Sequence, residues 1–233
     1  REWTIDTLYT RLAVTDSVLH LDTLYTEWKG ALATGSGTLG WARPHDGTIT
    51  LRLAADSLTA FDSLALALSG QTRDTARREQ HVLAGRATAQ VAIAGSLDTL
   101  QVAGVFGVHG FEFQGLRSPA DSGSFRYTGG ATPTFAGALR GDSISVLTDT
   151  LLKSAWQFHS TSLAVAGRPD SLAWSLGTGV GGISRVDGTG LYLRHDGGGV
   201  LAVDTLALDL PTRSWRLEAP TSVTLGDSAP VLT

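Results

Sequence analysis

The sequence predicts an all-β repeat protein, and three features of its 233 residues support that prediction. Apolar and polar residues alternate over many short segments, the period-2 pattern of strands that bury one face. Gly is abundant, at 28 residues, and the charged fraction of 17% lies below the roughly 25% typical of soluble domains. An Asp–Ser/Thr–aliphatic tripeptide also recurs along the chain. These features favour a β-solenoid over a β-sandwich or β-barrel.

The alternation is clearest in residues 85–113, which predict a strand, a turn and a second strand. The turn is expected at Gly95 and Ser96, because Gly and Ser are turn residues. The apolar positions before the turn are Ala87, Ala89, Val91 and Ile93. Those after it are Leu100, Val102, Phe106 and Val108. Side chains in phase share one face of a sheet, so this hairpin has one apolar face.

The Asp–Ser/Thr–aliphatic tripeptide is interpreted as a structural signal. Asp, Ser and Thr side chains bond to nearby backbone N–H groups and so favour turns and the starts of strands. Several copies lie roughly 34 to 44 residues apart, within the range of degenerate structural repeats. The tripeptide begins at Asp6, Asp16, Asp22, Asp56, Asp62, Asp98, Asp142, Asp149, Asp170 and Asp204.

Further in-phase apolar positions predict strands elsewhere. They are Ile49, Leu51 and Leu53, then Leu172, Trp174 and Leu176, then Leu206, Leu208 and Leu210. Two glycine-rich stretches, 35–40 and 177–182, are predicted to be turns or breaks. Residues 56–68 fit either a helical turn or a strand, and the charged segment 71–83 is a polar insertion or a short helix.

No motif in the sequence predicts catalysis, a cofactor or a metal ion. The stretches 35–40 and 177–182 match GxGxxG, but neither leads into a helix that could hold a pyrophosphate. The six His residues are scattered, no HExxH or GxSxG occurs, and there is no Cys. The net charge of −4 disfavours nucleic acid as a partner. A pair of carboxylates brought together from different coils, as in a glycosidase, stays open.

The organisation of the chain is predicted to be one elongated β-repeat region over residues 1–233. No run of about 18 apolar residues is present, so no transmembrane helix is expected. The sequence lacks Met and is patterned from its first residues, which is expected of a segment of a longer protein.

The residues 85–104, GRATAQVAIAGSLDTLQVAG, resemble the recurring hairpin of the TamB and AsmA-like family. Residues 53–64, LAADSLTAFDSL, are similar to the segment that often enters such a unit. The resemblance extends over residues 21–217 and lies in the general residue pattern rather than in a strict motif. It implies an incompletely closed β-solenoid folded like a taco shell (a β-taco), with an apolar groove along its length.

The resemblance also implies a function and a location. Family members lie in the periplasm of diderm bacteria, are anchored in the inner membrane by an N-terminal helix, and are implicated in moving phospholipid to the outer membrane. TamB also acts in outer-membrane protein assembly with a barrel partner, TamA. Neither the anchor nor a recognisable partner-binding end is visible in these 233 residues, and the insertion at 71–82 departs from a plain repeat.

The lipid-conduit hypothesis assigns a set of apolar residues to the groove. They are Leu51, Leu53, Val91, Ile93, Leu100, Val102, Phe106, Val108, Trp174, Leu206 and Leu208. Two other classes stay open at this point. One is a structural or adhesive solenoid with a closed core and no ligand, similar to an autotransporter passenger. The other is a β-helix enzyme or another β-sandwich.

Overall fold

The computed structural model confirms an open, all-β architecture. It describes residues 6–15, 17–40, 46–62, 83–96, 99–113, 115–149, 154–181, 184–195, 198–226 and 231–232. In these ranges the chain forms strands, apart from a short 3-10 helix, η1 (Thr59–Phe61).

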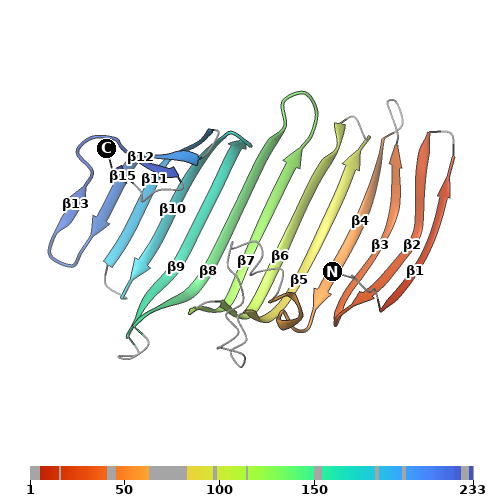
Figure 1. Ribbon diagram of the computed structural model, residues 1–233, viewed down its shortest axis with the longest axis horizontal. Coiled ribbons are helices and arrows are strands. Elements are labelled where there is room, and N and C mark those ends of the chain that lie inside the picture. Colours follow the sequence, from red (N-terminus) through yellow and green to blue (C-terminus); the bar gives the residue numbers. More distant parts are fainter. Residues whose placement is uncertain are drawn as a thin grey trace. The chain divides into compact units, whose positions relative to one another are not determined.

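The strands form one sheet in sequence order (Figure 1). The hydrogen-bonded path runs from β1 (Thr7–Val14) through consecutive strands to β12 (Gly198–Asp209), then to β14 (Thr221–Gly226) and β15 (Val231–Leu232). A short strand, β13 (Ser214–Arg216), also pairs with β12. The path is open, because β1 and β15 are its two ends and are not neighbours. Contacts divide the chain into two compact units, residues 1–122 and 123–233.

Unit 1, residues 1–122, is a series of long antiparallel strands. Each pairs with the next through cross-strand partners that share a face of the sheet. After β1 its strands are β2 (Val18–Trp28), β3 (Ala31–Gly40), β4 (Gly47–Ala55), β5 (Leu83–Gly95), β6 (Gln101–Phe113) and the first part of β7 (Leu116–Thr128).

Unit 2, residues 123–233, repeats this antiparallel arrangement. It begins within β7 and ends with the strands β12 to β15 named above. Its other strands are β8 (Thr134–Asp149), β9 (Ser154–Arg168), β10 (Ser171–Val180) and β11 (Ser184–His195).

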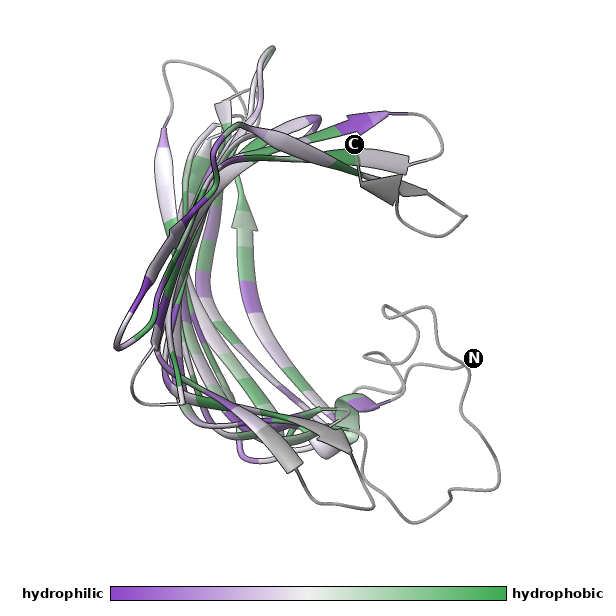
Figure 2. Cartoon of the chain, turned by 90° about the vertical axis from the view of Figure 1, so that its left-hand side faces the viewer, coloured by the Kyte–Doolittle hydropathy of each residue, from purple (hydrophilic) through white to green (hydrophobic). Residues whose placement is uncertain are grey.

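The predicted hairpin at 85–113 is confirmed as β5 and β6, with Gly95 ending β5. Alternation along the strands appears in Figure 2 as bands of apolar and polar residues. Successive side chains of a strand point to opposite faces of the sheet, so this alternation gives each unit one apolar and one more polar face.

Several predicted breaks are wrong, because the strands are longer than the local signals indicate. Residues 35–40 lie inside β3 rather than in a turn. Gly177 and Gly179 likewise lie inside β10 rather than in a break. In 56–62, which the sequence left ambiguous, the observed element is η1. The predicted insertion or helix at 71–83 lies outside the described residues, except that Leu83 begins β5.

The Asp–Thr signal also occurs within strands, where it accompanies a β-bulge. In β2, Leu21 and Thr23 pair with consecutive residues of β1, which leaves Asp22 as an extra residue. In β12, Val203 and Thr205 pair with consecutive residues of β11, which leaves Asp204 as the extra residue. A bulge shifts the side-chain alternation by one residue and bends the strand. The prediction that these copies start strands is therefore wrong for Asp22 and Asp204.

Candidate functional site: the uncovered apolar faces

The apolar face of unit 1 is assembled by cross-strand pairing over six strands. In one row, Gly37 of β3 lies opposite Ile49, Ile49 opposite Ile93, and Ile93 opposite Val102. Partners directly opposite in an antiparallel pair share a face, so each row extends the apolar surface. The apolar face of unit 1 includes Leu8, Leu12, Val14, Leu19, Leu21, Leu24, Trp28, Leu39, Ile49, Leu51, Leu53, Val91, Ile93, Val102, Phe106 and Val108.

Burial on this face varies from its centre to its β1 edge. Leu21, Leu39 and Ile49 form a buried cluster, in which Ile49 is only 7% exposed. Towards β1 the face is uncovered, and Leu8 and Leu12 are 57% and 54% exposed. Contiguous exposed apolar surface of this kind marks a site of interaction with another molecule.

One end of the apolar face of unit 1 is covered by η1. The ring of Phe61 in η1 packs edge-on against that of Trp28 in β2, with centroids 5.0 Å apart at 74°. The ammonium group of Lys29 lies 5.5 Å from the centroid of the same Trp28 ring. Backbone hydrogen bonding from Leu58 N–H to the carbonyl oxygen of Gly85 holds η1 against β5.

The structure places the predicted residues of unit 1 on this one face. Leu51 lies opposite Val91, Ala89 opposite Phe106, and Ala87 opposite Val108. Leu100 precedes β6 and packs against the buried cluster. Eight further members of the face were not in the predicted set: Leu8, Leu12, Val14, Leu19, Leu21, Leu24, Trp28 and Leu39. Ile49 was also omitted, although the sequence already showed it in phase with Leu51 and Leu53.

The apolar face of unit 2 is defined in the same way. It includes Phe135, Leu139, Leu163, Val165, Leu172, Trp174, Leu176, Val186, Tyr192, Leu201, Val203, Leu206, Leu208 and Trp215. The predicted residues of this unit, Trp174, Leu206 and Leu208, are all members. None of the buried apolar side chains in the described ranges belongs to unit 2, and Leu206 is 43% exposed.

Glycine makes room for the Trp174 indole on this face. Trp174 lies opposite Gly190, and its Nε1–H donates a hydrogen bond to the carbonyl oxygen of Ala202 at 3.3 Å. A Cβ atom on Gly190 would lie 2.8 Å from Trp174 ring atoms, closer than ordinary contact. The ring therefore lies over Gly188 and Gly190 of β11, next to Leu206.

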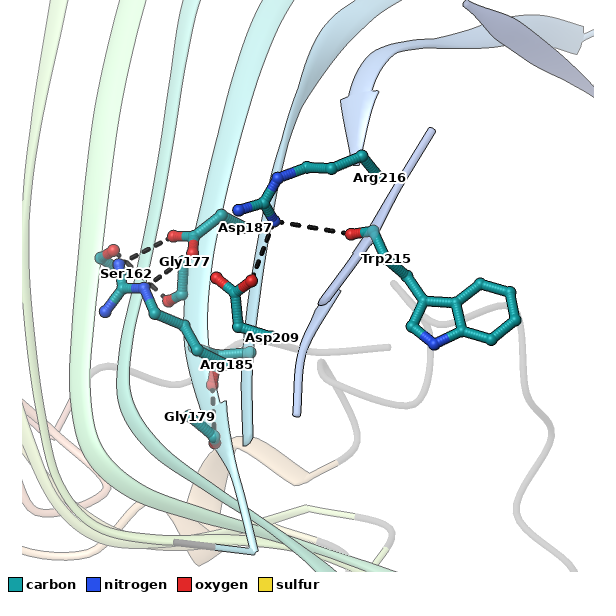
Figure 3. Close-up of polar contacts among 9 residues, drawn as sticks. Ser162, Gly177, Gly179, Arg185, Asp187, Asp209, Trp215 and Arg216 are labelled. Carbon is teal, nitrogen blue, oxygen red and sulfur yellow. Dashed lines mark hydrogen bonds and ion pairs between the residues drawn. The ribbon is translucent and has the colours of Figure 1, made fainter. Parts of the chain in front are cut away.

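The opposite face of unit 2 carries charged side chains, shown in Figure 3. Arg185 makes two bonds of 2.7 Å to Asp187, and Arg216 contacts Asp209 at 3.1 Å. The hydrogen bond and charge of Asp187 raise the pKa of Arg185. A hydrogen bond from Ser214, with a further bond and the charge of Arg216, holds the pKa of Asp209 below its ordinary value. These exposed pairs mark the solvated face.

A shallow hollow lies on the polar face of unit 1. Its lining includes Arg52, Gln90 and Val105, which are cross-strand partners on that face, and Leu53, Ala89 and Phe106, which form the next row of partners. Two of the predicted groove residues, Leu53 and Phe106, therefore border the hollow. Within the described ranges there is no group of three or more residues suited to hold a metal ion, and no helix long and apolar enough to cross a membrane.

These features define a class: an open, single-layer antiparallel sheet with one apolar and one polar face in each unit. Comparisons with protein-family models, with curated protein sequences and with solved structures found no match. The function is therefore argued from the two apolar faces themselves.

Proposed function

We propose that this chain is a segment of a TamB or AsmA-like lipid conduit, in which the apolar faces contact the acyl chains of phospholipids. The observation that carries the proposal is the uncovered apolar face of unit 1, with side chains such as Leu8, Leu12 and Leu53 at least 40% exposed. The proposal assigns no catalytic residue and no cofactor.

The energetic argument concerns what covers these faces. A one-sided apolar sheet is stable in water when another layer or a ligand removes its apolar side from solvent. An acyl chain supplies such a layer, at about 0.8 kcal/mol for each CH₂ group that it buries. Acyl chains make no hydrogen bonds, and the face offers them aliphatic and aromatic groups such as Leu51, Ile93 and Phe106.

The proposal includes the wider setting that the family resemblance implies. The protein would lie in the periplasm of a diderm bacterium, held to the inner membrane by an anchor outside these residues. It would serve outer-membrane biogenesis by carrying phospholipid between the two membranes, with a barrel protein of the TamA type as a possible partner. A closed, adhesive solenoid remains the alternative, but no observation in the described ranges favours it.

The direct test uses one photo-crosslinking amino acid at two adjacent positions. Val102 lies on the apolar face of unit 1, and Ala103 follows it on the opposite face. After incubation with vesicles of phosphatidylethanolamine and phosphatidylglycerol, benzoylphenylalanine at position 102 is expected to capture lipid, and at position 103 it is not. Equal capture at both positions, or none at 102, contradicts the proposal.

A second test introduces a charge into each apolar face. Val102→Glu and Leu208→Arg should reduce lipid transfer between labelled vesicles at least tenfold, because each places an ion where acyl chains would pass. Both side chains are only partly buried, so the sheet should still form, which circular dichroism checks. The matched controls Ala103→Glu and Ala207→Arg add the same charges to the polar faces and should leave transfer unchanged.

A further inference from the structure

Arg194 is a charged residue on the apolar face of unit 2. It lies near the end of β11, in phase with Val186 and Tyr192 on the same strand and opposite Gly199 of β12. Among the described residues of β10 to β14, no other residue that cross-strand pairing places on this face is charged. Strand β11 has a paired strand on each side, so the surroundings of Arg194 do not involve either end of the strand path.

The guanidinium group of Arg194 is available to a ligand. Its side chain is exposed and makes no ion pair or hydrogen bond with the described residues. Its backbone N–H donates to the carbonyl oxygen of Asp170 at 2.8 Å, but the carboxylate of Asp170 forms no ion pair with the guanidinium. Arg168, close to the same turn, lies on the polar face. Arg185 and Arg216 are paired with Asp residues, whereas Arg194 keeps its N–H donors for another molecule.

A second donor, the hydroxyl group of Tyr192, lies beside Arg194. A Cβ atom on Gly199 would lie 2.5 Å from the Tyr192 hydroxyl oxygen and 2.5 Å from its ring, so the phenol lies over Gly199. Gly199 is the cross-strand partner of Arg194, which places the hydroxyl group at the same end of the face. That hydroxyl group has no hydrogen-bond partner among the described residues. Two unpartnered donors therefore lie together where the apolar face ends.

The apolar surface that leads away from these donors is long enough for an acyl chain. The strand from Arg194 back to Val186 spans about 26 Å, at roughly 3.3 Å per residue. The hydrocarbon layer of one bilayer leaflet is about 15 Å thick. Trp174, Leu201 and Leu206 lie along this length of the face. The arrangement matches an amphipathic anion, with a charge at one end and a long apolar chain at the other.

We infer that Arg194 and Tyr192 bind the phosphate group of a phospholipid whose acyl chains lie on the apolar face of unit 2. The guanidinium group forms a bidentate, charge-assisted pair with phosphate oxygens, and the phenol donates a further hydrogen bond. The inference rests on the proposed function and adds to it the end of the face at which the headgroup lies. A neutral lipid with the same acyl chains has no phosphate, so only the apolar surface holds it.

The test uses the full 233-residue chain and two lipids that differ only in the headgroup. Benzoylphenylalanine at position 201, opposite Tyr192, reports lipid on this face. In dodecyl maltoside micelles it should capture phosphatidylglycerol about tenfold more than diacylglycerol with the same chains, because only the first lipid offers a phosphate to Arg194. Arg194→Gln should lower the capture of phosphatidylglycerol to that of diacylglycerol, whose capture should not change. Arg194→Lys keeps the charge and should keep part of the preference.

Arg168→Gln is the matched control, because Arg168 lies at the same end of the sheet on the polar face. It should leave both captures unchanged, and circular dichroism should be the same for all variants. Equal capture of the two lipids, or capture of phosphatidylglycerol that survives Arg194→Gln, would overturn the inference and leave the lipid-conduit proposal standing. No capture of either lipid would contradict both.

A competition experiment distinguishes a lipid headgroup from free phosphate. Millimolar inorganic phosphate should not reduce the capture of phosphatidylglycerol more than sodium chloride of equal ionic strength does, because the apolar surface contributes to binding of the lipid alone. A loss of capture specific to inorganic phosphate would show a site for the free ion and would overturn the inference.

Discussion

Apolar and polar residues alternate in both units, but the side chains on the apolar faces are buried to different degrees. In unit 1, aliphatic side chains from neighbouring strands converge, and Leu21, Leu39 and Ile49 become buried in one cluster. In the described part of unit 2 no apolar side chain is buried to that degree. There, Trp174 lies over glycines of β11, and ion pairs line the other face.

The difference shows that an apolar face and an apolar core are distinct properties of a sheet. Alternation places side chains on one side, but burial also requires neighbours large enough to cover one another. The row through Ile49, Ile93 and Val102 meets that requirement. In the row through Trp174 and Gly190 the ring fills the space above the glycine, but none of the described apolar side chains of unit 2 is buried. Side-chain burial should therefore stabilise unit 1 more than unit 2.

The largest expected effect is that of truncation in the cluster of unit 1. Ile49→Ala removes a nearly buried side chain and should cost about 2–4 kcal/mol of local stability. Leu206→Ala on the apolar face of unit 2 should cost about 1 kcal/mol or less, since that side chain is 43% exposed. Hydrogen exchange, measured strand by strand, reports the local stability of each unit separately. Equal losses of protection in the two variants would remove the distinction between the units.

A smaller loss of stability is expected when a side chain is added at Gly190 in unit 2. Gly190→Ala would bring Cβ into the Ala202 carbonyl oxygen and to 2.8 Å from Trp174. Shifting both the ring and the backbone of β12 at Ala202 should cost about 1–3 kcal/mol, and the tryptophan fluorescence should shift to longer wavelength. Gly107→Ala in unit 1 is the control, because its Cβ would meet Thr88 Oγ1 at an ordinary 3.6 Å. If Gly190→Ala is as neutral as Gly107→Ala, the packing described for Trp174 is incorrect.

The smallest effect concerns the charged face of unit 2. The pKa of Asp209 is lower in the folded chain than its ordinary value of 3.8. Its carboxylate therefore favours folding above that value, and the contribution is lost as the pH falls through the lower, folded-state pKa. Asp209→Asn should slightly lower the melting temperature at pH 7 and make it less sensitive to acid. The difference should shrink in 0.5 M NaCl, and a difference that grows with salt would contradict an ionic origin.

The sequence predicted the fold class and the apolar face of the central strands, because both depend on a period of two. From Leu51 to Val108 the predicted groove residues fall on one face, since no bulge interrupts the alternation between Ala87 and Val108. What occupies that face is a separate matter, which the proposed crosslinking addresses.

The errors arose where a local signal has two structural meanings. Gly35 was expected in a turn, but it lies in β3, where a Cβ atom would collide with Leu51 and the carbonyl oxygen of Thr50, so glycine is needed for close packing rather than for a turn. Leu21 and Leu24 share a face although they are three residues apart, because the bulge at Asp22 adds one residue. Simple alternation therefore loses its phase at the bulge. It gives no measure of exposure, so the high exposure of Leu8 and Leu12 could not be predicted.

The consecutive order of the strands also has a consequence for how the chain folds. From β1 to β12 each strand pairs with its neighbours in sequence, and most of these ladders close a short stretch of chain; the exception is the ladder of β4 and β5, which are separated by residues 56–82. Sheets built mainly from such local steps can begin at any hairpin and grow outward one strand at a time. Evolution can accordingly lengthen or shorten such a chain by whole hairpins, because a new hairpin has to match only the two strands beside it.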